Sequence, residues 1–291
     1  MRYEGTVYRP PSEANSLLIQ ATIGCPHNKC SFCSMYKQTS FKLRPVEEIK
    51  EDLLAARQYY GEYIESLFFP DGNTIIMKTA QLVDIFTYAR ELFPYLQRIT
   101  VYGSARFVNK KSLEDLQLLK DAGLSRIHTG MESGDDVTLQ RIRKGTTAAE
   151  IIEAGLKLKK VGIDTSEYYL VGIGGKERWR EHALESARVL SACSPDFIRL
   201  RTFVPIPGTP LYDEYKQGNF ELLSPHQALQ EISLLITNLQ CEGSYLLSDH
   251  ISNYWNIHGR LPDDREKMLA EIATALTIPE NRFRPAEISR L

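Results

Sequence analysis

Three of the five cysteines lie within one short segment, Cys25-Pro-His-Asn-Lys-Cys30-Ser-Phe-Cys33. Three thiolates on one loop can bind three irons of a cubane iron–sulfur cluster, and the fourth iron then lacks a protein ligand. Such an open metal position is what coordination of a substrate or cofactor requires. An odd number of cysteines with one tight group fits a metal site in a reducing compartment better than a disulfide framework.

A structural zinc site is the alternative for the same loop. His27 would complete a Cys₃His set, which is an established set of zinc ligands. However, His27 follows Cys25 by only two residues, which is tight spacing for a tetrahedral knuckle. The loop therefore favours the cluster, and zinc stays open as the alternative.

The elements that must position these cysteines alternate along the chain. β-Branched or aromatic runs predict six strands, and apolar residues at three- and four-residue spacing predict helices between them. The predicted strands cover residues 17–23, 64–69, 99–102, 126–129, 165–171 and 197–203, and the helices residues 46–59, 79–92, 112–122, 148–160 and 179–190. Strands that alternate with helices imply parallel pairing with right-handed crossovers.

A doubly wound sheet and a barrel both fit this alternation. Polar motifs at the strand ends favour an α/β fold of the open (β/α)6 partial TIM barrel type, with its chemistry at the C-terminal ends of the strands. Residues 1–210 are expected to form this core. Residues 211–291 are expected to form a small C-terminal helical cap, not an independent domain, with helices near residues 226–240 and 265–276.

Polar residues follow the second predicted strand and lie within the sixth. Asp71 and Asn73 can accept hydrogen bonds from an ammonium group, and Gly72 allows close backbone approach. A plain turn is the alternative for these three residues. Arg199 and Arg201 share one strand face and would suit a carboxylate or phosphate. Salt-bridged interior arginines are the alternative for this pair.

The segment from His128 to Gly134, with Glu132 and Ser133 between two glycines, continues through a matching stretch to Thr146. Together with the cysteine loop it resembles the radical S-adenosylmethionine (SAM) superfamily, and within it the coproporphyrinogen oxidase, Elp3 and methylthiotransferase-like subfamily. The family's usual motif has three residues between its first two cysteines, whereas this chain has four.

The resemblance implies a [4Fe-4S] cluster bound by Cys25, Cys30 and Cys33, with S-adenosyl-L-methionine as the second cofactor. It also implies an aromatic contact to adenine, polar contacts to the methionyl group, contacts to the ribose or carboxylate, and a glycine beside adenine. The residues expected to bind SAM are Phe32, Asp71, Gly72, Asn73, Ser104, Glu132 and Gly174, with Arg199 as a further contact to cofactor or substrate.

By this resemblance the chain is expected to be an enzyme that reductively cleaves SAM to a 5′-deoxyadenosyl radical. That radical would abstract hydrogen from an anionic small-molecule substrate, with flavodoxin or ferredoxin as the electron donor. SAM would be either consumed or regenerated. The alternatives are an RNA-modifying radical SAM enzyme and a non-enzymatic zinc or iron–sulfur binding protein.

Composition and charge argue against several other classes of protein. The net charge is −2, which lacks the basic surplus of a dedicated nucleic-acid binder. No apolar run approaches membrane-spanning length, and residues 1–11 lack a signal-peptide core, so a cytoplasmic location is expected. Cys193 and Cys241 are too few for a second four-cysteine cluster, which argues against methylthiotransferase chemistry. The sequence leaves the oligomeric state open.

Overall fold

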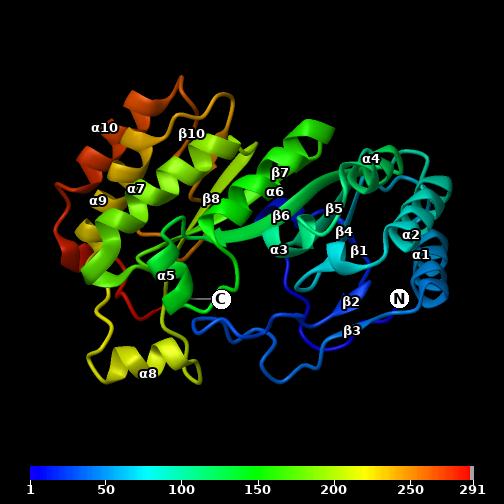
Figure 1. Ribbon diagram of the computed structural model, residues 1–291, viewed down its shortest axis with the longest axis horizontal. Helices are drawn as coiled ribbons and strands as arrows, with labels where there is room; N and C mark the ends of the chain where they lie inside the picture. Colours follow the sequence, from blue (N-terminus) through cyan, green and yellow to red (C-terminus); the bar gives the residue numbers. More distant parts are fainter. Residues whose placement is uncertain (289–291) are drawn as a thin grey trace. The chain divides into compact units, whose positions relative to one another are not determined.

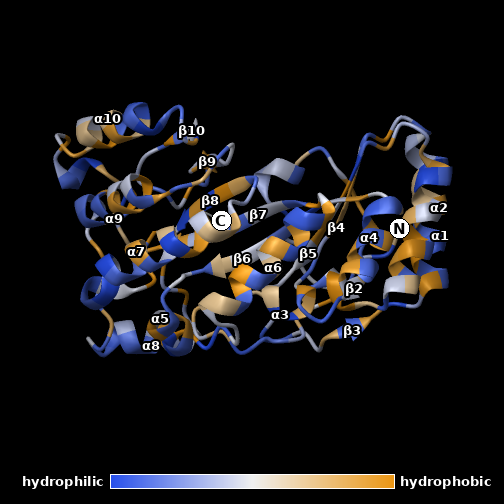
Figure 2. Cartoon of the chain, turned by 45° about the horizontal axis from the view of Figure 1, so that its top comes forward, coloured by the Kyte–Doolittle hydropathy of each residue, from blue (hydrophilic) through white to orange (hydrophobic). Residues whose placement is uncertain are grey.

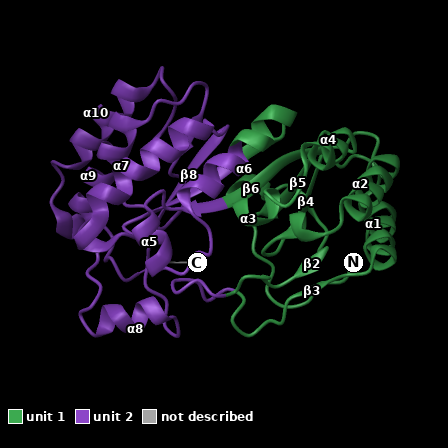
Figure 3. Ribbon diagram, in the orientation of Figure 1, with its two compact units in different colours: residues 1–28, 36–129, 156–165 green, residues 29–35, 130–155, 166–291 purple. Residues whose placement is uncertain are grey.

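Parallel strands alternate with helices through residues 1–288, the part of the chain that the computed structural model describes. The main sheet has the strand order β1-β4-β5-β6-β7-β8-β9-β10, and β2 and β3 form a separate two-stranded sheet. The chain divides into two compact units (Figure 3). Unit 1 contains residues 1–28, 36–129 and 156–165, and unit 2 contains residues 29–35, 130–155 and 166 onward.

Unit 1 contains parallel strands and three amphipathic helices (Figure 1). Its strands are β1 (Leu17–Leu18), β4 (Ser66–Phe69), β5 (Arg98–Gly103) and the first part of β6 (Leu124–Glu132), with β2 (Thr22–Ile23) and β3 (Lys42–Leu43) paired apart. Its helices are α1 (Val46–Tyr60), α2 (Thr79–Leu92), the short α3 (Ala105–Val108) and α4 (Leu113–Asp121), and 3-10 turns occur at η1 (Pro11–Glu13) and η2 (Thr74–Ile76).

Helix α1 illustrates why these segments are helical. Ile49, Leu53 and Ala56 recur at spacings of four and three residues, and all three are fully buried. Helix α1 packs against α2, and Figure 2 shows apolar and hydrophilic segments alternating along both helices. The helix ends at Gly61, whose φ of +77° is readily accessible to glycine.

Unit 2 contains the later strands and the longest helix. Its strands are the end of β6, β7 (Asp164–Val171) from Ser166 onward, β8 (Phe197–Thr202), β9 (Tyr245–Leu247) and β10 (His258–Arg260). Its helices are α5 (Asp136–Arg141), α7 (Gly175–Cys193), α8 (Pro210–Lys216), α9 (Pro225–Asn238) and α10 (Arg265–Ala275), followed by η3 (Glu280–Arg282). Helix α6 (Ala148–Val161) has residues in both units. Helix α9 packs against both α7 and α10 (Figure 1).

The two faces of β7 and β8 in unit 2 differ in what they contact. Tyr169 stacks on His182 of α7, with ring centroids 4.5 Å apart, and therefore lies on the helix-covered face. Neighbouring residues of a strand alternate between faces. Tyr168, Arg199 and Arg201 consequently lie on the opposite face, since Tyr168 pairs in register with Arg199.

The predicted fold class is confirmed, because each of the six predicted strands contributes at least part of its length to the mostly parallel sheet. The predicted strand at residues 17–23 is instead two strands, because the chain leaves β4 after Leu18 and pairs antiparallel with β3. The C-terminal region was expected to be helical only, but it also adds β9 and β10 to the sheet. The division at residue 210 stays a prediction.

Within residues 1–288, no helix combines the length and the apolar character that crossing a membrane would require.

Candidate functional site

The turn after β4 lies directly against Cys25 in unit 1. The Gly72 N–H donates to the Gly24 carbonyl at 3.0 Å. A Cβ added at Gly72 would lie 2.7 Å from Cys25 Cβ and 2.8 Å from its Cα. Real side chains do not approach so closely, so this turn requires glycine in order to hold Cys25 in place.

Asp71 uses its carboxylate to anchor the chain around the cysteine loop. It is 1% exposed, and its Oδ2 accepts from Gln20 Nε2 at 2.6 Å and from the Gly24 N–H at 3.3 Å. Its Oδ1 accepts from Tyr36 Oη at 3.3 Å. Burial raises the pKa of Asp71 to about 6, against the opposing effect of these hydrogen bonds. Its direct contact with SAM stays a prediction.

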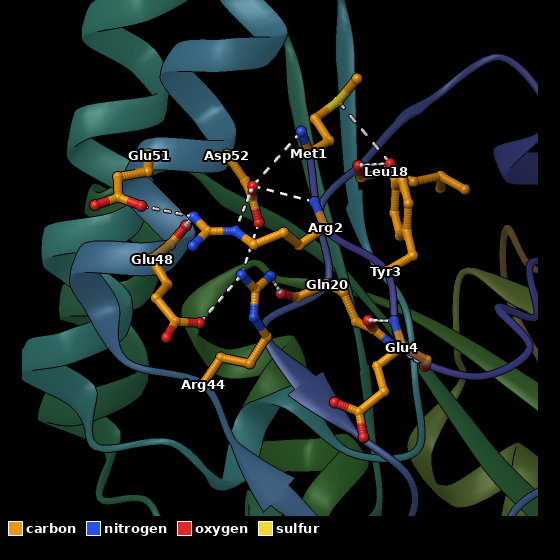
Figure 4. Close-up of polar contacts among 10 residues, drawn as sticks. All are labelled: Met1, Arg2, Tyr3, Glu4, Leu18, Gln20, Arg44, Glu48, Glu51 and Asp52. Atoms are coloured by element: carbon orange, nitrogen blue, oxygen red, sulfur yellow. Dashed lines mark hydrogen bonds and ion pairs between the residues drawn. The ribbon is translucent and has the colours of Figure 1, made fainter.

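Gln20, which donates to Asp71, also hydrogen-bonds to the N-terminal residues (Figure 4). Gln20 exchanges two hydrogen bonds with the Glu4 backbone, at 2.9 and 3.1 Å. Its carbonyl accepts from Arg44 Nη1 at 2.6 Å, and Arg44 Nη2 lies 2.7 Å from Asp52 Oδ2. Arg2 contacts the other oxygen of Asp52 at 3.1 Å. This network fixes the chain just before Cys25.

Asn73 carries a buried acceptor that no described residue satisfies. Its side chain is nearly fully buried, and its Nδ2 donates to Ser104 Oγ at 2.9 Å. Among residues 1–288, no hydrogen-bond donor reaches Asn73 Oδ1. Ser104 is the residue that precedes helix α3. A buried acceptor without a partner indicates that a bound group supplies the donor.

The other two cysteines belong to unit 2, where the backbone between them is fixed. The Ser31 N–H donates to the Ile142 carbonyl at 2.9 Å, and the Ser31 carbonyl accepts from the Leu211 N–H at 2.9 Å. Cys30 and Cys33 are partly exposed, as is Phe32 between them. The loop therefore presents both thiols and the aromatic ring from a rigid backbone.

Glu132 ends β6 in a left-handed conformation, with φ of +63°, and pairs with Lys144 at 3.0 Å. A Cβ added at Gly130 would overlap the Glu132 carboxylate and lie 2.9 Å from Lys144 Nζ. Burial lowers the pKa of Lys144, but the charges of Glu132, Cys30 and Cys33 outweigh burial and raise it above its ordinary value. Lys144 therefore stays charged beside these acidic groups.

Lys144 is a functional candidate that the sequence prediction missed. The signal that could have found it is its place in the stretch that ends at Thr146, where the resemblance continues beyond Glu132. A lysine that follows a short helix is not part of any recognisable spacing pattern. Only its ion pair with Glu132 identifies Lys144 as a functional candidate.

Gly174 and Arg199 both lie close to other residues of unit 2. A Cβ added at Gly174 would lie 3.0 Å from His182 Cβ and 3.1 Å from the Arg178 carbonyl, so that side faces α7. Arg199 is 6% exposed, and its Nε donates to Ser166 Oγ at 3.1 Å. Their contacts with SAM stay predictions.

The predicted iron ligands are divided between the two units. Cys25 belongs to unit 1, and Cys30 and Cys33 belong to unit 2. Within the described part of the chain, no three histidine, cysteine or acidic side chains are already gathered in a metal-binding group. The ligand set therefore remains a prediction from spacing and chemistry.

A family model described as the Radical SAM superfamily matches residues 19–187. The chain belongs to the radical SAM superfamily. This match covers the cysteine loop, Asp71 to Asn73 and Glu132, and it confirms the family predicted from those residues. Radical SAM proteins are enzymes that use a [4Fe-4S] cluster and SAM, so this chain is a radical SAM enzyme with those cofactors. The family therefore favours the cluster over the zinc-binding alternative.

Individual proteins and structures are also similar to this chain. An uncharacterised protein of Methanocaldococcus jannaschii is 25% identical over 240 residues, covering 79% of this chain and 72% of its own length. A biotin synthase of Persephonella marina is 32% identical over 231 residues, covering 77% of this chain. The structure of coproporphyrinogen III oxidase from Escherichia coli matches with a TM-score of 0.58 at 16% identity, covering 76% of this chain.

This chain spans 63% of that biotin synthase and 51% of that oxidase chain. The comparison with the oxidase shows a shared fold. The reaction that follows SAM cleavage is not carried over from either protein.

Proposed function

We propose that the protein binds its cluster through Cys25, Cys30 and Cys33 and abstracts hydrogen from an anionic small molecule. When bound, the cluster and SAM supply a 5′-deoxyadenosyl radical, given one electron from a donor such as flavodoxin or ferredoxin. Three thiols fit three irons and leave one for the methionyl group. The observation that carries the proposal is the buried Asn73 Oδ1 in the turn that packs on Cys25.

The proposed SAM contacts divide by chemistry. Asn73 Oδ1 suits the methionyl ammonium, which is a strong donor. Glu132 suits the ribose hydroxyls, because one carboxylate can accept from both. Phe32 suits the adenine ring, with Gly174 beside it, while Ser104 orients Asn73. Gly72 and Asp71 keep Cys25 and the loop in place.

Anaerobic reconstitution tests the proposal. The purified chain is loaded with iron and sulfide, reduced with dithionite and given SAM. We expect a [4Fe-4S] spectrum and 5′-deoxyadenosine as a product. One zinc per chain without SAM cleavage would overturn the proposal.

Glu132→Gln should weaken SAM binding. The substitution keeps the size of the side chain but removes the charge that accepts from two hydroxyls and pairs with Lys144. We expect the Kd for SAM to rise roughly tenfold, as for loss of a charged hydrogen bond. Equilibrium dialysis of the reconstituted protein measures it. Glu185→Gln, on the exposed face of α7, is the matched control and should leave the Kd unchanged. Equal Kd values for the two variants would remove Glu132 from the site.

The anionic substrate is supported by the face of β8 that points away from α7 and α9. Arg201 lies over the Tyr168 ring, 4.9 Å from its centroid, beside the buried Arg199. In the described residues, neither arginine pairs with an aspartate or glutamate. Burial and the charge of Arg201 lower the pKa of His250 to about 4, partly offset by Asp249. One buried and one half-buried guanidinium group, neither paired with a carboxylate in the described part of the chain, favour a bound carboxylate or phosphate.

Arg199→Gln should separate substrate use from SAM cleavage. A cellular metabolite extract is divided by anion exchange, and each fraction is added to the reduced enzyme with SAM. We expect the retained, anionic fraction to stimulate 5′-deoxyadenosine formation in the natural protein. Arg199→Gln should reduce this stimulation roughly tenfold or more, because it removes a buried charge partner. Basal cleavage without extract, measured in the same variant, tests separately whether Arg199 contacts SAM.

Arg188→Gln on α7 is the control, because Arg188 is exposed and pairs only locally with Glu185. Stimulation by the unretained fraction alone would contradict an anionic substrate. Equal stimulation of the Arg199→Gln variant would remove Arg199 from substrate binding.

A further inference from the structure

A chain of buried polar side chains connects the segment after Glu132 to helix α9, within unit 2. Ser133 Oγ lies 2.8 Å from Nδ1 of His182 on α7. His182 Nε2 lies 3.5 Å from Oε1 of Glu231 on α9. Ser133, His182 and Glu231 are all fully buried. A contact between two helices and the end of β6 therefore passes through one imidazole ring.

Glu231 is held firmly at the far end of this chain. Its Oε1 accepts from Tyr169 Oη and from the Gly172 N–H, each at 2.9 Å. The ring of Tyr169 also stacks on His182, with an interplanar angle of 6°. Glu231 therefore holds the Tyr169 ring, and that ring packs flat on the imidazole.

The hydrogen-bond directions follow from protonation. Ser133 Oγ accepts from the Asp135 N–H at 3.0 Å, which leaves its own hydrogen for Nδ1 of His182. Burial lowers the pKa of His182 to about 3, so the ring is neutral at physiological pH. A neutral ring that accepts at Nδ1 carries its hydrogen on Nε2, which lies 3.5 Å from Glu231 Oε1 and outside the geometry of a hydrogen bond.

The order serine, histidine, glutamate resembles a nucleophilic triad, but Ser133 has no exposed surface from which to attack a substrate. Its position suggests a different use. Ser133 adjoins Glu132, and the next residue, Gly134, donates its N–H to Ser186 Oγ of α7 at 2.7 Å. The left-handed backbone of Glu132 is thus followed at once by two anchors on α7.

We infer that His182 is a positioning residue for the SAM site, which holds Ser133 and thereby the Glu132 carboxylate in place and makes that placement depend on helix α9. The inference rests on the proposed contact between Glu132 and the ribose. It assigns to α9, in the predicted C-terminal cap, a role in cofactor affinity.

Three substitutions at His182 test the inference in the reconstituted full chain. His182→Phe keeps a ring to stack on Tyr169 and removes the hydrogen bond with Ser133 Oγ. We expect the Kd and KM for SAM to rise roughly tenfold, with kcat at saturating SAM retained, because a buried hydrogen bond is lost. His182→Asn places an amide near the position of Nδ1 and should restore most of the affinity. His182→Gln places its amide near Nε2 and should restore little.

Controls separate positioning from general destabilisation. Ser191→Ala, on the same helix, removes the hydroxyl that accepts from the Gln240 N–H and should lower the Tm without changing the Kd. If His182→Phe does not fold, Ser133→Ala removes the same contact with a smaller change of volume and should raise the Kd similarly.

A folded His182→Phe variant with an unchanged Kd and KM for SAM would overturn the inference. Glu132→Gln distinguishes a failure of the positioning role of His182 from a failure of the proposed role of Glu132. If Glu132→Gln weakens SAM binding but His182→Phe does not, only the positioning role fails. If neither variant changes the Kd, the proposed role of Glu132 fails as well.

Discussion

Replacing Cys30 with alanine is expected to abolish cluster binding and SAM cleavage. Two remaining thiols on the loop cannot hold three irons, so the cluster loses one of its three protein ligands. Bound iron and acid-labile sulfide should fall to less than about a tenth of the natural protein's content, and 5′-deoxyadenosine should not exceed background. Metal analysis and EPR spectroscopy of the reduced protein measure these changes.

Cys241→Ser is the matched control for this variant. Cys241 is buried in unit 2 against the Leu190 carbonyl, at 3.5 Å, and lies outside the loop in sequence. This control should keep its iron and its SAM cleavage even if it loses some stability. A Cys30→Ala protein with full iron content and activity would contradict the proposed ligand set.

Replacing Gly72 with alanine is expected to damage the site without removing any predicted ligand. The new Cβ would lie 2.7 Å from Cys25 Cβ and 3.0 Å from the Gly24 carbonyl, so the cysteine loop or the turn after β4 must move. Overpacking of this kind costs about 1–3 kcal/mol of stability. We expect iron content after reconstitution to fall severalfold and SAM cleavage to fall further, because Cys25 and Asn73 both shift.

Gly218→Ala is the control for backbone and stability effects. Gly218 has a φ of +76°, so alanine is strained there, but nothing lies within 4 Å of the added Cβ. It should lower the free energy of unfolding by about 1 kcal/mol and leave iron content unchanged. If Gly72→Ala binds iron as well as Gly218→Ala does, the close packing on Cys25 is not important for the site.

The parts that the sequence predicted are those with a local signal. Helix α2 has the predicted bounds, because its apolar residues repeat over a full fourteen-residue span. The cysteines and Glu132 could be recognised because each lies in a contiguous motif. In contrast, β9 and β10 are three residues long, which is too short for any period to be visible.

The parts that the sequence missed depend on contacts between distant residues. His182 meets Ser133 across 49 positions, and Tyr169 meets Glu231 across 62. No pattern within α7 or α9 distinguishes these side chains from ordinary core residues. The Asp71 carboxylate contacts Gln20 across 51 positions and Tyr36 across 35, and those partners become visible only when the chain is folded.

Because strand β9 covers one edge of β8, removal of the C-terminal region would expose that edge. Strand β9 pairs in parallel with β8, from Phe197 with Tyr245 to Arg199 with Leu247. A chain cut after residue 210 would therefore leave β8 with a row of unpaired N–H and carbonyl groups and strip α9 from the apolar side of α7. An uncovered edge of this kind promotes strand-to-strand aggregation. Solubility, rather than catalysis, would be the first property lost by such a shortened chain.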